Sequence, residues 1–210
     1  MLIHPWDGAT DDAEWRDWLA GHDFGHLVAA GRGRDLPVVQ PTHFVYDGAA
    51  AVWLHLARAN PIWPLLEENP HALLTVTGDY AYVPAGWNAA PGTDPAKRVP
   101  TSYYASVQLE CTARVIDDPG RKAALLTRQL AHFEEPGTRV PVRTGDEEDR
   151  RRLPGIRGVE LTVTGVRAKF KFGGNKDVAQ RERIGERLAC RAEGFDAAAR
   201  AQVLRRTPPG

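Results

Sequence analysis

The sequence predicts an α+β fold in which antiparallel strands close into a small β-barrel with helices at its periphery. Three observations lead to this prediction. Strand-like runs follow one another closely along the chain, the Asp47-Gly48 pair between two of them is a strong hairpin signal, and helices interrupt the strands without strict alternation. Strict alternation would favour a doubly wound parallel sheet, so this order favours the antiparallel barrel.

The elements are expected in the following order. Residues 11–20 predict a short helix, which Asp11 caps and Gly21 ends. A second short helix is expected from Pro61, with Asn60 as its cap, to a point before Pro70. Strands are expected at 24–30, 36–46, 51–57, 72–77, 79–83, 103–117 and 159–172. Further helices are expected at 119–134, 177–190 and 196–205.

Two segments lack a periodic pattern. Residues 84–101 are rich in proline and glycine and predict a long loop, which in a compact domain is usually functional or mobile. Residues 136–154 are charged and contain prolines and glycines, so they predict an exposed excursion. We expect three regions along the chain, namely an N-terminal helical segment at 1–22, the barrel domain at 23–175 and C-terminal helices at 176–210.

Composition excludes several classes of protein. The chain has 210 residues, of which 42% are hydrophobic and 26% charged, as is ordinary for a protein with a core. The 27 basic and 27 acidic residues cancel, so no global attraction to nucleic acid or to an anionic membrane is expected. No run approaches the roughly 20 apolar residues of a membrane helix. The N-terminus does not resemble a signal peptide, so a cytoplasmic location is expected, with Cys111 and Cys190 as two buried thiols.

The junction between a strand and a capped helix at residues 55–63 is the most informative segment. Arg58 carries a planar set of donors that suits a phosphate, and the first N–H groups of the helix, with Asn60 beside them, favour an anion. The alternative is an ordinary helix entry with a surface arginine. His43 and His55 lie on adjacent hairpin strands and are expected to face one another, but neither strand offers a third ligand, so no metal site is predicted.

The segment His55–Trp63, with the pattern His-x-Ala-Arg-Ala-Asn-Pro-x-Trp, resembles the signature of the PaiB-like FMN-binding proteins. These are also called FMN-binding negative transcriptional regulators. Three more segments resemble the family in the same order. They are Asp23–Val28, Ala81–Trp87, and Val99–Thr101 followed by Tyr104.

The resemblance implies a split β-barrel of the pyridoxamine-phosphate-oxidase type, which forms a homodimer with two FMN molecules at the subunit interface. It also implies roles for particular residues. Arg58 and Asn60 meet the FMN phosphate, with His55 in the same signature. Thr42 and His43 lie along the flavin, and Thr101 and Tyr103 approach it from the next long strand. Lys169, Lys171 and Asn175 match the family's Lys-x-Lys-x-x-x-Asn stretch and reach across the dimer.

The chain departs from the family at two of these places. Where the family has Thr-Trp-Asn-Tyr, this chain has Thr101-Ser102-Tyr103-Tyr104, and a Ser-Gln pair is replaced by Gly173-Gly174. These changes predict either weaker flavin binding or a reshaped pocket, and the Gly173-Gly174 pair lets the backbone approach a different ligand closely. The insertion at residues 88–98 lies where a lid over the ring would be.

Three functions therefore remain open at this stage. The first is a flavin-dependent redox protein, such as an FMN-dependent oxidoreductase, although no residue stands out as a catalytic acid or base. The second is a transcriptional regulator that binds DNA or a protein partner, for which no helix-turn-helix pattern is found. Its basic residues Arg181, Arg183, Arg187 and Arg191 are interleaved with Glu182 and Glu186. The third is a barrel that binds another ligand, such as haem or a deazaflavin.

Overall fold

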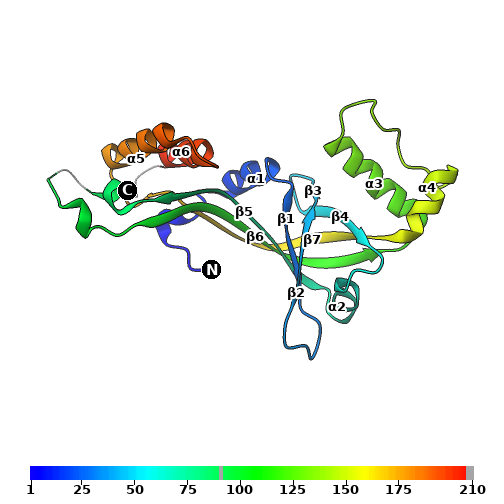
Figure 1. Cartoon of the computed structure of the whole chain (residues 1–210). Helices are drawn as coiled ribbons and strands as arrows, with labels where there is room; N and C mark the ends of the chain where they lie inside the picture. The colour runs from blue at the N-terminus through cyan, green and yellow to red at the C-terminus, as the bar shows by residue number, and fades with distance from the viewer. Residues whose placement is uncertain (90–91, 207–210) are drawn as a thin grey trace. The chain divides into compact units, whose positions relative to one another are not determined.

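The strands join into one seven-stranded sheet in the order β2-β1-β5-β6-β7-β4-β3. The computed structural model describes residues 1–89 and 92–206 (Figure 1). The strands are β1 Phe24–Ala29, β2 Val38–His43, β3 Val45–Tyr46, β4 Ala51–Ala57, β5 His71–Val83, β6 Thr101–Ile116 and β7 Ile156–Lys171. β1 pairs antiparallel with β2 and β5, and β4 pairs antiparallel with β3 and β7. The antiparallel pairing that the sequence predicts is confirmed.

The two edge strands of the sheet are neighbours in the chain. β2 ends at His43 and β3 begins at Val45, so only Phe44 separates them. In a flat sheet, six strand spacings would hold these edges about 29 Å apart, whereas one extended residue advances the chain by about 3.3 Å. The sheet therefore curls until its two edges meet at the buried side chain of Phe44, which closes it into a barrel.

The chain forms two compact units. The barrel unit contains Arg16–Val76 and Gln108–Val166. The terminal unit contains Met1–Trp15, Thr77–Val107 and Arg167–Gly210. The long strands β5, β6 and β7 contribute residues to both units, and every strand contributes to the barrel unit. The sequence predicts three consecutive regions, at 1–22, 23–175 and 176–210, and this division stays a prediction. Residues 207–210 of the third region lie outside the described residues.

The core of the barrel unit follows from the period-two pattern of its strands. Val52 of β4 lies opposite Leu161 of β7, and Leu54 lies opposite Val159. All four side chains are fully buried. Burying an aliphatic side chain of this size contributes roughly 1.5–3 kcal/mol, and cross-strand pairs fix the register because a slip of one residue would expose them all.

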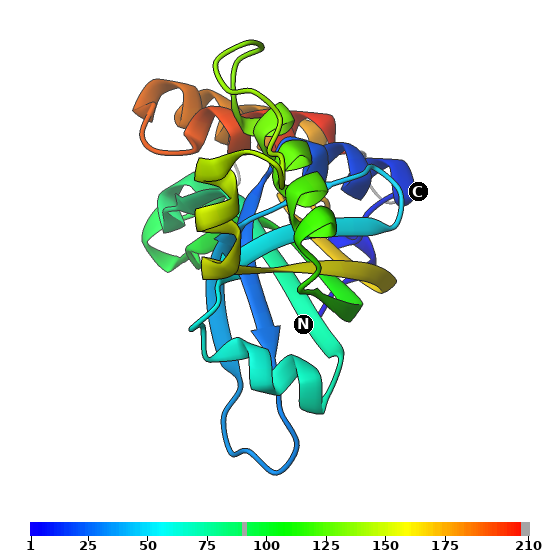
Figure 2. The same ribbon diagram turned by 90° about the vertical axis from the view of Figure 1, so that its right-hand side faces the viewer.

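The helices are α1 Asp12–Ala20, α2 Ile62–Glu68, α3 Pro119–Phe133, α4 Glu147–Arg152, α5 Val178–Arg191 and α6 Asp196–Arg205. α3 begins where it does because Asp118 accepts a hydrogen bond from the N–H of Arg121 and Pro119 occupies the first helical position. In the barrel unit α3 lies over β4, as Figure 2 shows. In the terminal unit α5 and α6 pack side by side through Ile184, Leu188, Ala199 and Val203 (Figure 1).

Several local predictions need correction. The strand expected at 36–46 is two strands, β2 and β3, because the chain passes from one edge of the sheet to the other at Phe44. At the Asp47-Gly48 turn, only Gly48 has a positive φ, of 80°. The carboxylate of Asp47 organises a longer loop by accepting hydrogen bonds from the N–H groups of Ala49, Ala50 and Ala51.

The strands expected at 72–77 and 79–83 are one strand, β5. Within this strand Asp79 has a φ of 53°, and Gln202 donates a 2.7 Å hydrogen bond to its buried carboxylate. The excursion expected at 136–154 contains helix α4, and short 3-10 turns lie within the loop expected at 84–101. Residues 90 and 91 of the expected lid insertion lie outside the described residues.

The two cysteines differ in exposure. Cys111 is buried, and burial raises the pKa of its thiol to about 12. Cys190 is exposed because it lies on the outer face of α5, so the expectation of two buried thiols is wrong for this residue. None of the helices in the described part of the chain combines the length and the apolar character that a membrane crossing requires.

Candidate functional site

His43 and His55 face one another in the barrel unit, as the sequence predicts. β2 ends at His43 and β4 carries His55, and their rings meet edge to face with centroids 5.4 Å apart. Burial lowers the pKa of His43, and the neighbouring His55 lowers it further, with a smaller opposing effect from Asp23. The adjacent Thr42 is buried and donates its hydroxyl to the carbonyl of His43 at 2.9 Å.

Helix α3 supplies two contacts to this histidine pair that the sequence analysis missed. Oε1 of Gln129 lies 2.6 Å from Nδ1 of His55, and the ring of Phe133 lies 5.1 Å from that of His43. Leu125, Gln129 and Phe133 are spaced four residues apart and so share one helix face. A polar Gln129 on the inner face of an amphipathic helix was the available signal for this contact.

Arg58 is held by acceptors within the barrel unit. Its Nη2 donates to Asp117 at 2.9 Å and its Nε donates to the carbonyl of Pro154 at 2.7 Å. Arg157 also binds Asp117, and this hydrogen bonding lowers the pKa of the Asp117 carboxyl. The bonds to Asp117 and Pro154 thus fix the direction of the Arg58 guanidinium, and neither of them uses its Nη1 atom.

Asn60 acts on the entry to helix α2. Its Oδ1 accepts the N–H of Ile62 at 3.0 Å, and its Nδ2 donates to Gln40 of β2 at 2.8 Å. The first helical N–H group is therefore already bonded. Asn60 ties the helix entry to the edge strand that leads to Thr42 and His43.

The terminal unit brings four of the predicted residues together around one pocket of about 370 Å³. They are Thr101, Tyr103, Lys171 and Asn175. The sequence analysis missed further residues that line it, among them His4, Trp6, Asn88 and Lys176. The N-terminal segment reaches this place because Gly8 forms a β-bridge with Lys169 of β7.

Two polar atoms at this pocket are buried without a hydrogen-bond partner among residues 1–89 and 92–206. They are the Tyr103 hydroxyl and Oδ1 of Asn88. Burial raises the pKa of Tyr103, so its hydroxyl stays protonated and is a donor at neutral pH. Lys171 donates to the hydroxyl of Thr101 at 2.9 Å. An unsatisfied buried polar atom costs about 1–3 kcal/mol, which a ligand with matching groups relieves.

Lys169 lies beside the pocket and has internal partners. Its Nζ donates to the carbonyl of Leu2 at 2.8 Å and lies 4.0 Å from the carboxylate of Asp7. Both side chains are buried. Lys169 thus holds the N-terminal segment against β7, and its role toward a flavin stays a prediction.

The ten predicted residues fall into two groups. Thr42, His43, His55, Arg58 and Asn60 belong to the barrel unit, and Thr101, Tyr103, Lys169, Lys171 and Asn175 belong to the terminal unit. The barrel-unit group comes from residues 42–60, whereas the terminal-unit group joins the start of β6 to residues 169–175, which are distant in sequence.

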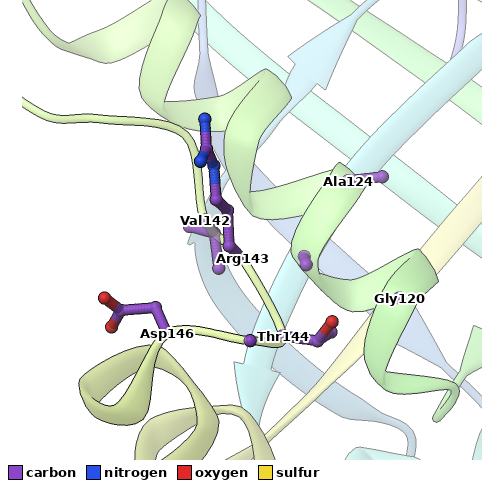
Figure 3. A pocket seen from close by; sticks show the side chains of 8 residues that line it. Gly120, Ala124, Val142, Arg143, Thr144 and Asp146 are labelled. Atoms are coloured by element: carbon purple, nitrogen blue, oxygen red, sulfur yellow. The ribbon is translucent and has the colours of Figure 1, made fainter.

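The barrel unit also contains hollows that hold none of the ten predicted residues except His55. The pocket in Figure 3 lies between α3 and residues 142–146, and the side chains of Arg143, Thr144 and Asp146 point in different directions around it. A pocket of about 220 Å³ beside His55 is lined by five aliphatic side chains and also by Arg139, Asp149 and Arg152. Arg139 and Asp149 form an ion pair with each other. No group of three or more potential ligands for a metal ion occurs within the described ranges.

Comparison with known proteins gives the family. Residues 1–165 match the family described as "Putative FMN-binding domain". The flavocytochrome Anf3 from Azotobacter vinelandii is similar in structure, with a TM-score of 0.60, 21% identity, and coverage of 81% of this chain and 72% of that chain.

A FAD and heme binding protein from Mycobacterium smegmatis has a TM-score of 0.56 and 21% identity over 86% of this chain and 80% of that chain. At these identities the two structures show a shared fold. No curated protein matches the sequence. The family match covers most of the chain and agrees with the resemblance carried by residues 55–63, so this protein belongs to the FMN-binding domain family, whose cofactor is FMN.

Proposed function

We propose that this protein is a homodimeric, flavin-dependent redox protein built on a split barrel of the pyridoxamine-phosphate-oxidase type. One observation carries the proposal furthest. In a chain of the FMN-binding family, four residues chosen for flavin contact from the sequence line one pocket, together with two buried polar atoms that lack partners in the described part of the chain.

The polar atoms of the terminal-unit pocket fit a flavin ring. The Tyr103 hydroxyl is a donor and Asn88 Oδ1 is an acceptor. The pyrimidine edge of a flavin presents both carbonyl oxygens and an N–H group, so it can satisfy both atoms. FMN, when bound, supplies the electron-transfer chemistry, while the protein supplies position and electrostatics.

Arg58 fits the role of phosphate ligand in the barrel unit. Its guanidinium is fixed by Asp117 and Pro154, and Nη1 lies outside those bonds. A prepositioned arginine loses little side-chain entropy when it binds a phosphate. Asn60 contributes by fixing the helix entry beside it. His43, whose pKa is lowered, would present an uncharged ring to the flavin at neutral pH.

The homodimer follows from the family resemblance and from the division of the residues. The resemblance places each FMN where two protomers meet. The barrel-unit group and the terminal-unit group can then come from different protomers, so that each crevice is completed by the partner chain. This arrangement is part of the proposal and is tested below by molecular mass.

The structure gives little support to a DNA-binding role. Of the four basic residues noted on α5, Arg181 is buried and donates to the carbonyl of Arg206, and Arg191 pairs with Asp196 at 2.6 Å. The other two, Arg183 and Arg187, alternate in the sequence with Glu182 and Glu186. We therefore propose redox chemistry in preference to transcriptional regulation.

The visible absorption spectrum of the purified protein tests this proposal. An oxidised flavin spectrum that bleaches on addition of dithionite and returns in air is the expected result. A haem or deazaflavin spectrum would show that the protein binds that ligand in place of FMN. A colourless protein that takes up no FMN at micromolar concentration would contradict the proposed function.

A further inference from the structure

The terminal-unit pocket carries more positive charge than an oxidised flavin ring requires. Lys171 and Lys176 both line it. Within the described residues, no carboxylate lies within 4.0 Å of either ammonium group. The flavin ring is uncharged when oxidised, and the charge of FMN is on its phosphate, which the proposed function assigns to Arg58. The two lysines are therefore available to bind an anion other than the FMN phosphate.

The one carboxylate at the pocket does not cancel this surplus. Asp7 is buried, and burial raises the pKa of its carboxyl. Its strongest electrostatic partner is Lys169, 4.0 Å away, ahead of His4 and Lys171. Asp7 is thus matched first to the lysine that anchors the N-terminal segment. The neighbouring Asp177 acts on Lys176 and opposes the lowering of its pKa by burial, but it forms no ion pair with it among the described residues.

The Tyr103 hydroxyl lies at the same pocket and is the donor that the proposed function assigns to the flavin ring. Tyr103 is 1% exposed and its hydroxyl has no partner in the described part of the chain. Gly173, which also lines the pocket, lies against this hydroxyl, since a Cβ at this position would lie only 2.5 Å from the hydroxyl oxygen. The two ammonium groups therefore remain as charged donors for a carboxylate or a phosphate.

We propose that this pocket binds the carboxylate or phosphate group of a small anionic substrate, with Lys171 and Lys176 as its donors. The inference deepens the proposed function and rests on it, since it names the class of compound presented to the flavin. His4 and Trp6 also line this pocket, and their rings stack on each other with centroids 4.8 Å apart.

Inorganic phosphate is the probe that tests the anion site. It is titrated into FMN-saturated protein by calorimetry, for the wild type, for Lys176→Gln and for the matched control Lys97→Gln. Lys97 is in the same unit, and its side chain is 84% exposed. The control loses the same charge outside the pocket.

The expected result is phosphate binding to the wild type and to Lys97→Gln, and binding roughly tenfold or more weaker in Lys176→Gln, the scale of one charged hydrogen bond. FMN affinity, measured separately, is expected to be equal in all three proteins. Equal phosphate binding in the two variants would overturn the proposal.

Phosphate that binds only the apo-protein and is displaced by FMN would also overturn it, because the pocket would then hold the cofactor's own phosphate. Failure of the proposed function is seen independently, as absence of FMN uptake. In that case the same titration on apo-protein still decides whether Lys176 belongs to an anion site.

Discussion

At the scale of single residues, Arg58 is the group to which we assign the FMN phosphate. It is half-exposed yet fixed by Asp117 and Pro154. A surface ion pair of this kind adds little stability, so the value of the contact lies in the direction it gives the guanidinium.

We therefore predict that Arg58→Ala weakens FMN binding by roughly 1–3 kcal/mol, about tenfold to a hundredfold. Fluorescence quenching of FMN on titration with apo-protein measures this. Arg150→Ala is the control, because Arg150 is an exposed arginine of α4 in the same unit. Equal affinity of the two variants would remove Arg58 from the phosphate site.

His43 gives a prediction on pH. Its pKa is lowered from 6.5 chiefly by burial and then by His55. Because the folded state disfavours the charged form, its contribution to stability is present above pH 6.5 and is lost as the pH falls from 6.5 through the folded pKa. NMR titration of the His43 ring should give a midpoint below 6.5, and His55→Gln should move it upward. A wild-type midpoint at or above 6.5 would contradict this.

The sequence predicts candidate-site residues that are close together in the chain. It misses residues that only long-range pairing brings to the pocket. Arg58 and Asn60 are close in sequence at a strand-to-helix junction, so their proximity is local. His4 and Trp6 reach the pocket only because the N-terminal segment pairs with Lys169, more than 160 residues away. Nothing in the local pattern around His4 carries that information.

At the scale of elements, the turn after β7 determines the shape of the terminal-unit pocket. Gly173 has a φ of 74°, where L-residues are strained, and it faces the Tyr103 hydroxyl. Gly137 has a φ of 88°, but a Cβ at that position would meet no atom within 4 Å, so it shares the strain without the clash.

We predict that both Gly173→Ala and Gly137→Ala lose roughly 1–2 kcal/mol of unfolding free energy from backbone strain. Gly173→Ala should lose more, because its methyl group meets Tyr103. Adding Tyr103→Phe should recover that excess by removing the hydroxyl. Urea unfolding measures all four proteins, and an equal loss in the two alanine variants would show that the hydroxyl does not limit the pocket there.

The strands were predictable because apolar alternation is a local signal. The segment expected at 51–57 is β4, with the same bounds, and residues 196–205 form α6 as expected. Helix α4 was not predicted because its sequence, Glu147–Arg152, is charged throughout and has no apolar period. Its available signals were the Asp146 cap and the Glu147–Arg151 and Glu148–Arg152 pairs at i,i+4.

At the scale of the whole molecule, closure of the sheet at Phe44 is a long-range property. The strand pattern at 36–46 is continuous in sequence, and only the order of the complete sheet shows that its two ends are different edges. The predicted oligomeric state belongs to the same scale, since it depends on how two copies of the chain complete each cofactor site.

We predict that FMN-loaded protein is a homodimer at micromolar concentration. Light scattering coupled to size exclusion should give twice the chain mass. A monomer that nevertheless retains FMN would show that one chain holds the cofactor alone, and the assignment of the two residue groups to different protomers would be wrong.

The most direct test of the account is a parallel titration of apo-protein with FMN and with riboflavin, followed by flavin fluorescence. The account predicts saturation at one FMN per chain in the micromolar range or below, and much weaker binding of riboflavin, because riboflavin lacks the phosphate that Arg58 holds. Equal affinity for the two flavins, or no uptake of either, would contradict the central claim that this barrel binds FMN through its phosphate and its ring.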